Sequence, residues 1–166
     1  VQVAASRGAG LVCSHTGGAQ PRTRPHRVRY GDDPSGVVDE VVDEVSAAAA
    51  RAAAAGVRTD GIIVDPTHDF GKNTHHGLAL LRHTDRLVAT GYPVLMALSN
   101  KDFVGETLGV ELTERLEGTL AATALAAADG ARMFRVHEVG PTRRVLEMVA
   151  SIQGTRPPTR TVRGLA

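Results

Sequence analysis

The sequence has 166 residues, a length that suits one domain, and its hydrophobic fraction of 42% is enough for a core of ordinary size. Its 19 Lys and Arg nearly balance its 18 Asp and Glu, and aromatic residues make up only 3%, so we expect no nucleic acid as a partner. One cysteine, Cys13, excludes an internal disulfide framework, and no apolar run approaches the roughly 20 residues of a membrane span. We therefore expect a cytoplasmic, enzyme-like chain without a membrane partner.

Residues 1–10 have the pattern of the end of a helix and lead directly into an apolar strand. They contain no methionine, signal-type apolar region or cap, so we expect the chain to begin inside a larger protein. Residues 9–15 predict a short buried strand, in which Cys13 is expected to pack rather than to act as a nucleophile. The glycine-rich loop over residues 16–36 has the length of a functional lid or a disordered segment.

A stripe of valines and alanines at 3.6-residue spacing predicts a helix over residues 37–56, with acidic residues on its other face and Gly56 at its end. Residues 61–65 follow as a buried strand that contains three β-branched residues and breaks at Asp65-Pro66. Asp65 therefore stands where a parallel strand delivers its end to a loop, a common position for chemistry. An ordinary Asx turn is the alternative interpretation.

The next elements are a helix of about 15 residues, stopped by Gly91, and a third strand over residues 94–98. Leucines and a valine mark the buried side of that helix: Leu78, Leu81, Leu87 and Val88. The third strand ends at Ser99-Asn100-Lys101, where alternation places Ser99 and Lys101 on the same side.

A loop that carries Gly105 and Gly109 then leads to Thr113, which we expect to cap an Ala-rich helix that ends near residue 130. The fourth strand is predicted over residues 132–139, and a last helix over residues 141–152. Arg135 and His137 share a face at the C-terminal end of this fourth strand.

Four strand-helix units in strict alternation predict a parallel sheet with right-handed crossovers, which is an α/β fold. A complete eight-stranded barrel takes about 250 residues, and an open four-stranded sheet would leave both edges bare. We therefore predict the C-terminal half, four βα units, of a TIM (β/α)8 barrel. Residues 1–153 would form this partial barrel domain, and residues 154–166 a flexible tail rich in Pro and Arg.

Successive strands offer complementary polar groups at their C-terminal ends: Asp65, then Ser99 with Lys101, then Arg135 with His137. A carboxylate accepts two N–H donors from an aminopyrimidine-like ring, and Lys, Arg and His together hold a phosphate or pyrophosphate. Structural roles remain open for each residue. Arg135 and Glu138 would then form a solvated pair, and His137 would be a satisfied core histidine.

A competing metal cluster would use the histidines near the second strand together with Asp69: His68, His75, His76 and His83. The adjacent His75 and His76 would point roughly 100° apart on a helix, which argues against convergence on zinc. The sequence contains no dinucleotide-binding glycine motif, P-loop or nucleophile elbow.

Four motifs occur in the order and spacing of dihydropteroate synthase: Asp65-Pro66 with Phe70-Gly71-Lys72, Gly91-Tyr92-Pro93-Val94-Leu95 leading to Ser99-x-Lys101, and the segments 115–122 and 135–139. Over residues 5–152 the chain resembles the C-terminal half of this pterin-binding barrel, in particular the divergent second paralogue of some high-GC bacteria. The resemblance implies folate biosynthesis: condensation of 6-hydroxymethylpterin pyrophosphate with p-aminobenzoate by a barrel that is a homodimer at full length.

By resemblance, Asp65 would hold the pterin ring, Lys101 would contact the pterin and the p-aminobenzoate region, and Ser99 would contact the latter. The remaining substrate-binding residues would be Phe70 in the pocket wall, and Arg135 and His137 on the ring or pyrophosphate. No catalytic residue is assigned. The family also implies Mg²⁺, but its protein ligand has no counterpart in this chain, so we expect no metal ligand here.

The chain departs from the family pattern at several positions. The family's Asp-Pro-Gly-x-Gly-Phe is replaced by a segment with Thr67 and Asp69 at the glycine positions, and Asp69 would add negative charge beside the pterin. Asn100 replaces an arginine that can stack on the aminobenzoate, and Thr16 replaces an apolar methionine.

From these departures we expect a divergent paralogue with lost or altered activity, a transferase by resemblance that is inactive as this chain alone. A non-catalytic protein that binds a pterin, pyrophosphate or a partner on the same barrel is the alternative.

Overall fold

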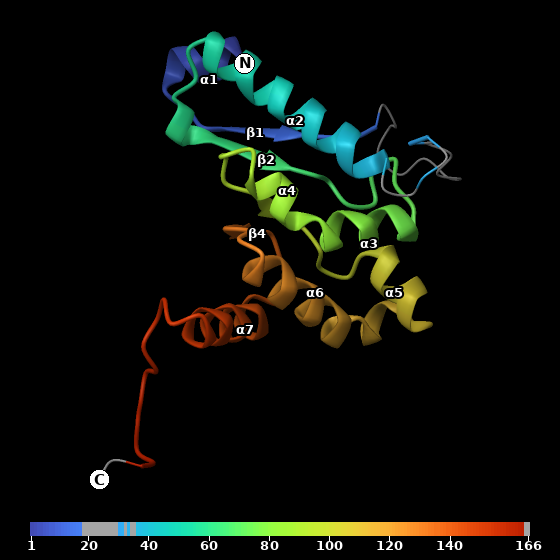
Figure 1. The fold of residues 1–166 in the computed structure, drawn as a ribbon, viewed down its shortest axis with the longest axis vertical. Helices are drawn as coiled ribbons and strands as arrows, with labels where there is room; N and C mark the ends of the chain where they lie inside the picture. Colours follow the sequence, from blue (N-terminus) through green and yellow to red (C-terminus); the bar gives the residue numbers. More distant parts are fainter. Residues whose placement is uncertain (18–29, 32, 34–35, 165–166) are drawn as a thin grey trace.

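The computed structural model describes residues 1–17, 30–31, 33 and 36–164, whose helices and strands alternate along the chain (Figure 1). Most of the loop predicted over residues 16–36 lies outside the described residues, as does the end of the predicted tail. The first element, α1 (Gln2–Arg7), is the helix expected before the first strand.

The strands run parallel, and their order in space is their order in the sequence. β1 (Leu11–Ser14) pairs in parallel with β2 (Ile62–Asp65), and Ser14 lies opposite Asp65. A parallel bridge from Val64 to Val94 joins this pair to the second pair, in which β3 (Leu95–Met96) runs parallel to β4 (Met133–Phe134). The predicted α/β fold is confirmed. Each strand lies next to the strand that precedes it in the sequence, as in the sheet of a (β/α)8 barrel.

The helix α2 (Gly36–Ala54) lies along the β1–β2 pair (Figure 1) and turns its apolar stripe toward it. Its buried side chains are Val37, Val38, Val41, Val45, Ala49 and Ala52. They join one core cluster with Ile62 and Val64 of β2, while Asp39 and Asp43 on the same helix are exposed. A short 3-10 helix, η1 (Thr59–Gly61), leads into β2. Cys13 is buried beneath α2, and burial raises the pKa of its thiol, in agreement with a packing role.

The single helix predicted after β2 is two helices, α3 (Thr74–Arg82) and α4 (Thr84–Val88), which meet at His83. The buried Thr84 hydroxyl donates to the carbonyls of Leu80 and Leu81, so a side chain takes the place of continuing backbone bonds. The predicted span of about 15 residues is therefore correct, and so is its end near Gly91, but the prediction of one continuous helix is wrong.

The segment predicted as a loop with Gly105 and Gly109 is a helix, α5 (Asp102–Leu108), whose Phe103 and Val104 are buried. Gly105 is required because the Arg115 side chain crosses the position of a Cβ, and Gly109 ends the helix at φ 66°. Glycine therefore serves close packing here rather than a loop, and the prediction is wrong.

The predicted cap at Thr113 is also wrong. Thr113 lies in a 3-10 helix, η2 (Leu112–Glu114), which Glu111 and Glu114 close with a reciprocal capping box. The Ala-rich helix, α6 (Leu116–Ala128), starts after Arg115 without a side-chain cap. The side-chain cap thus closes the turn before the helix and is made by Glu111 and Glu114, not by Thr113.

The third and fourth strands are shorter than predicted. Arg135 N–H still donates to the carbonyl of Met96 at 3.0 Å, but His137 N–H donates to the Ser99 hydroxyl, so a side chain ends the strand pairing. The helix α7 (Val139–Ile152) begins two residues before Pro141. After α7 the chain runs away from the rest of the molecule (Figure 1). The domain boundary at residue 153 and the flexibility of the tail stay predictions.

The described helices include none that combines the length and apolar character needed to span a bilayer. The two outer strands of the wall expose apolar side chains, Val12 in β1 and Met133 in β4. Such exposure is expected where a barrel wall ends in an edge strand.

Candidate functional site

A cavity of about 290 Å³ opens where β3 and β4 end. Its lining residues are Phe70, Ala97, Ser99, Lys101, Arg135, Val136 and His137. Five of the six residues predicted to bind substrate therefore meet around one cavity, although they come from three separate loops. Arg135 and His137 are exposed at its mouth, so the interpretation of His137 as a core histidine is wrong.

Asp65, the sixth predicted residue, lies beside this cavity rather than in its lining. It is only 4% exposed, and its carboxylate accepts the N–H of Thr67 at 2.7 Å while the Thr67 hydroxyl donates back to the Asp65 carbonyl. Burial raises the pKa of Asp65 above its ordinary value, and the Thr67 N–H, Arg135 and Lys101 act in the opposite direction. The Asx-turn interpretation is thus correct, and the carboxylate still lies within the field of the cavity's cations.

Lys101 follows β3, and its side chain contacts the loop that follows β2. Its ammonium donates to the carbonyl of His68 at 3.0 Å and lies 5.2 Å from the centroid of the Phe70 ring. This distance allows a cation–π interaction. Lys101 and Phe70 therefore form one polar and aromatic wall of the cavity.

Glu138 links the loop after β4 to the loop after β3, and it was not predicted as a site residue. It accepts hydrogen bonds from the Ser99 hydroxyl at 3.1 Å and from the Asn100 amide at 3.3 Å. Although desolvation acts the other way, the hydrogen bonds from Asn100 and Ser99 lower the pKa of the Glu138 carboxyl. The alternative interpretation, in which Glu138 forms a solvated pair with Arg135, is therefore wrong: its carboxylate is bonded to Ser99 and Asn100.

Lys72 is a second residue that the sequence did not single out as functional. It is 2% exposed, and its ammonium donates to the carbonyls of His15, Thr67 and Phe70 at 3.0 to 3.3 Å. Burial lowers its pKa to about 8, although Asp65 and other carboxylates oppose the shift. Its position in the Phe70-Gly71-Lys72 motif was the available signal.

Three of the four substituted family positions share an unusual backbone conformation. Thr67, Asp69 and Asn100 have φ values of 52°, 70° and 57°, and they are the non-glycine residues with positive φ in the described part of the chain. Left-handed backbone favours glycine, which is the family residue at two of these positions. The Asp69 carboxylate accepts the N–H of Asp102 at 2.9 Å, so it is directed to the start of α5.

The histidines considered for zinc do not converge. His68 is buried beside Phe103, and the Nδ1 of His76 accepts the N–H of Asn73 in the cap of α3. His75 and His83 are exposed. Within the described ranges, these residues do not appear together in any group with metal-ligand spacing.

Residues 1–137 match the sequence pattern of the family described as pterin binding enzyme. The match covers most of the chain and includes the ends of all four strands. The chain belongs to the pterin-binding enzyme family.

The chain is also similar to individual proteins of the kind that the motifs predicted. The inactive dihydropteroate synthase 2 of Mycobacterium leprae (strain TN) is 79% identical over 165 residues, which are 99% of this chain and 57% of that protein. A solved Mycobacterium tuberculosis structure is 62% identical, with a TM-score of 0.72 over 95% of this chain and 56% of that one.

The dihydropteroate synthase of Thermus thermophilus, solved in complex with 4-aminobenzoate, is 38% identical. Its TM-score is 0.82, and the match covers 91% of this chain and 57% of that chain. A structure of the same synthase in complex with 6HMPPP has a TM-score of 0.78.

The chain thus spans about half the length of the relatives that it matches. The prediction of a partial barrel of the dihydropteroate synthase family is confirmed, and so is its likeness to the divergent second paralogue.

Proposed function

We propose that this chain is the C-terminal half of a divergent dihydropteroate synthase paralogue that retains a subsite for a pterin pyrophosphate and has lost or altered the synthase reaction. One observation carries the proposal. The predicted pyrophosphate-binding groups line an open cavity, whereas the polar groups on its aminobenzoate side are hydrogen-bonded to Glu138.

The cavity supports binding of an anionic substrate. Lys101 and Arg135 carry positive charge, and His137 is exposed beside them. Charge-assisted hydrogen bonds from such groups are the usual means of holding a phosphate. Asp65, within the field of Lys101 and Arg135, supplies the carboxylate that the pterin ring would need.

The second substrate meets a different environment. The Ser99 hydroxyl donates its single proton to Glu138 and accepts the backbone N–H of His137, so it has no donor left for a carboxylate of the second substrate. Asn100 is bound to the same carboxylate and has no guanidinium plane to stack on an aromatic ring. Glu138 also presents a negative charge to a benzoate, which disfavours its binding.

The implied family reaction breaks the bond between the pterin methylene carbon and the pyrophosphate oxygen. The arylamine nitrogen then bonds to this carbon and loses a proton. Positioning of both substrates and neutralisation of the leaving group supply most of the rate enhancement in such a step. The residues of this chain would neutralise the leaving group but would place the arylamine poorly.

The Mg²⁺ that the family implies does not fit the residues of this cavity. Mg²⁺ prefers carboxylate and water oxygens in octahedral geometry, whereas the polar lining includes the cations Lys101 and Arg135. We therefore assign it no ligand in this chain. Homodimer formation and a cytoplasmic location belong to the same proposal.

Isothermal titration calorimetry of the full-length protein tests the proposal. We expect micromolar binding of the pterin pyrophosphate, weaker binding of pyrophosphate alone, and no binding of p-aminobenzoate even with pyrophosphate present. Arg135→Ala should weaken pterin pyrophosphate binding by roughly tenfold or more, because a charge-assisted hydrogen bond is lost. The matched control is Arg132→Ala, an exposed arginine outside the cavity lining, which should change nothing.

Absence of binding by either pyrophosphate compound would favour the alternative of a partner protein on the same barrel. Formation of dihydropteroate at a rate typical of enzymes would contradict the loss of the second subsite.

A further inference from the structure

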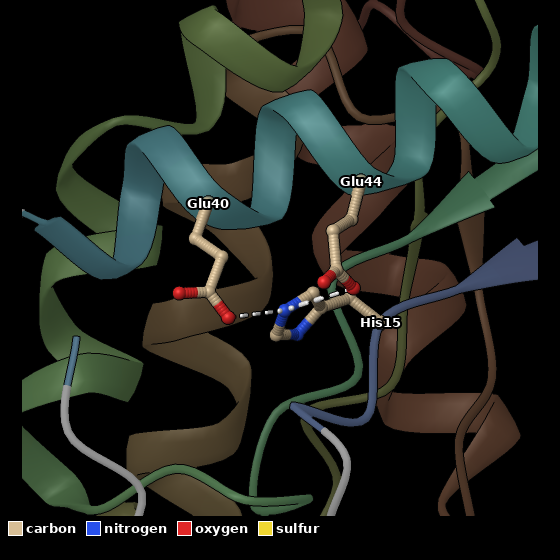
Figure 2. A group of neighbouring side chains, drawn as sticks. All are labelled: His15, Glu40 and Glu44. Carbon is tan, nitrogen blue, oxygen red and sulfur yellow. Dashed lines mark ion pairs between the residues drawn. The ribbon is translucent and has the colours of Figure 1, made fainter.

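Three side chains outside the cavity converge at the junction of β1 and α2. Glu40 and Glu44 stand one helical turn apart on α2, so both project from the same face. His15 follows the end of β1, and its Nε2 lies 3.5 Å from Glu40 Oε1 and 3.4 Å from Glu44 Oε2. Figure 2 shows both carboxylates turned toward the imidazole ring.

His15 has a buried polar side chain without an ordinary partner. The residue is 1% exposed, and neither ring nitrogen makes a hydrogen bond to the part of the chain that the structure describes. Buried polar atoms are nearly always hydrogen-bonded, so an imidazole aimed at two carboxylates without such a bond needs another explanation. A shared cation between the three groups would supply it.

The position of the imidazole suits a ligand role. The Nε2 of His15 faces one carboxylate oxygen of each glutamate, at 3.5 Å for Glu40 and 3.4 Å for Glu44. A neutral imidazole offers a nitrogen lone pair, which is the form that binds metals.

The distances match a tetrahedral ion. Metal–ligand bonds of about 2.0–2.1 Å to nitrogen and oxygen place the ligand atoms of a tetrahedral site about 3.4 Å apart. The ligand atoms of His15, Glu40 and Glu44 all lie within 4.8 Å of one another, and the two contacts to Nε2 are close to the expected edge. The glutamate side chains are 43% and 60% exposed, so an ion and a water ligand can approach.

The surrounding charges leave the two carboxylates without a cationic partner among the described residues other than His15. Lys72 lies nearby, but its ammonium is bound to three backbone carbonyls. Tyr30 donates its phenolic proton to the carbonyl of Gly71 and brings no positive charge to the two glutamates. A divalent ion would balance the two negative charges.

We propose that His15, Glu40 and Glu44 bind a divalent transition-metal ion of the Zn²⁺ class, with water completing the tetrahedron. An imidazole ligand distinguishes this site from one for Mg²⁺, which selects oxygen ligands. The ion joins α2 to the end of β1. At the same strand end, the backbone carbonyl of His15 accepts a hydrogen bond from Lys72, a residue of the loop after β2. Metal binding therefore stabilises the end of β1 and, through Lys72, the neighbouring loop next to Asp65.

Titration of the EDTA-treated full-length protein with ZnCl₂, followed by calorimetry and thermal unfolding, tests the site. We expect one Zn²⁺ per chain with a dissociation constant in the micromolar range or below, and a melting temperature that rises with Zn²⁺ because the ion binds only the folded state. Co²⁺ should give the visible absorption of a tetrahedral complex, and MgCl₂ should bind far more weakly.

Glu44→Gln and Glu40→Gln should each weaken Zn²⁺ binding at least roughly tenfold and should abolish the thermal shift. Mutation of residues that only hydrogen-bond to a metal ligand already causes losses of this size, so the loss of a ligand should cause at least as much. Glu40 is partly exposed and Glu44 is exposed, so these isosteric variants should fold. Asp43→Asn is the matched control, because it removes one charge from the exposed side of the same helix. Unchanged Zn²⁺ binding in either Gln variant, equal loss in the control, or no binding by the wild type would overturn the proposal.

Discussion

His68 and His15 bury their imidazole rings close to the loop that follows β2, and this burial makes the fold sensitive to acid. The pKa of His68 is lowered to about 3 by burial and by the charges of Lys72 and Lys101, with only the backbone of Gly77 acting in the opposite direction. Neither His68 nitrogen makes a hydrogen bond of ordinary geometry to the described residues. The ring therefore stays neutral in the folded state under conditions where an unfolded histidine is charged.

The sign of the pH effect follows from these pKa values. An unfolded histidine takes up its proton as the pH falls below about 6.5, whereas folded His68 does so only near 3. The unfolded state binds more protons in between, so the free energy of unfolding falls as the pH falls. Each fully linked histidine contributes a slope of about 1.4 kcal/mol per pH unit.

We predict that His68→Leu reduces the pH dependence of the free energy of unfolding between pH 6.5 and 4 by about 1.4 kcal/mol per pH unit. His15 retains its own contribution in this window, so part of the slope remains. Urea unfolding at a series of pH values measures it. His75→Leu, at an exposed position, is the control and should leave the slope unchanged; an equal slope in His68→Leu would show that His68 is not the linked group.

Contacts between neighbouring loops organise the elements around the cavity. Asp69, in the loop after β2, accepts the first backbone N–H of α5 across the structure. This carboxylate acts as a cap supplied from another part of the chain, and it lies where negative charge is favoured by the helix dipole. Asp69 thus has a structural role at a position whose left-handed backbone glycine would adopt more easily.

Replacement of Asp69 by Ala should therefore destabilise the protein by about 1–3 kcal/mol, because the cap is lost and the left-handed backbone remains strained. Asp69→Asn is the matched control, since Asn keeps the acceptor and tolerates φ above zero, and it should cost far less. Thermal unfolding of both variants measures the difference. Equal destabilisation by Ala and Asn would mean that the charge, and not the cap, is what matters.

The molecule as a whole is part of a barrel wall. The strands β1 to β4 run parallel in chain order, and the relatives that the chain matches are about twice as long. In a barrel, ligands bind in loops contributed by strands from all around the ring. The cavity described above therefore holds only part of the site that a synthase needs.

We accordingly predict that these 166 residues, expressed alone, form no dihydropteroate from pterin pyrophosphate and p-aminobenzoate. Product formation followed by chromatography measures this, with an active dihydropteroate synthase as the positive control. Turnover by the chain alone would contradict the conclusion that the other strands carry part of the site.

Local patterns in the sequence were sufficient for the strand-helix order, for the buried stripe of α2 and for Asp65 at the end of β2. They were sufficient because periodicity and motif spacing depend on neighbours along the chain. The motifs also identified the lining of the cavity, apart from the displacement of Asp65 to its side.

Only the tertiary structure decided the partners of Glu138, the formation of α5 and the meeting of His15 with the two glutamates of α2. Each depends on side chains that lie far apart in the sequence and become neighbours when parallel strands and their helices pack. Glu138 meets Ser99 through the pairing of β3 with β4, and Gly105 within α5 leaves the space that the Arg115 side chain occupies. Propensity and motif carry no information on such contacts, because packing can override both.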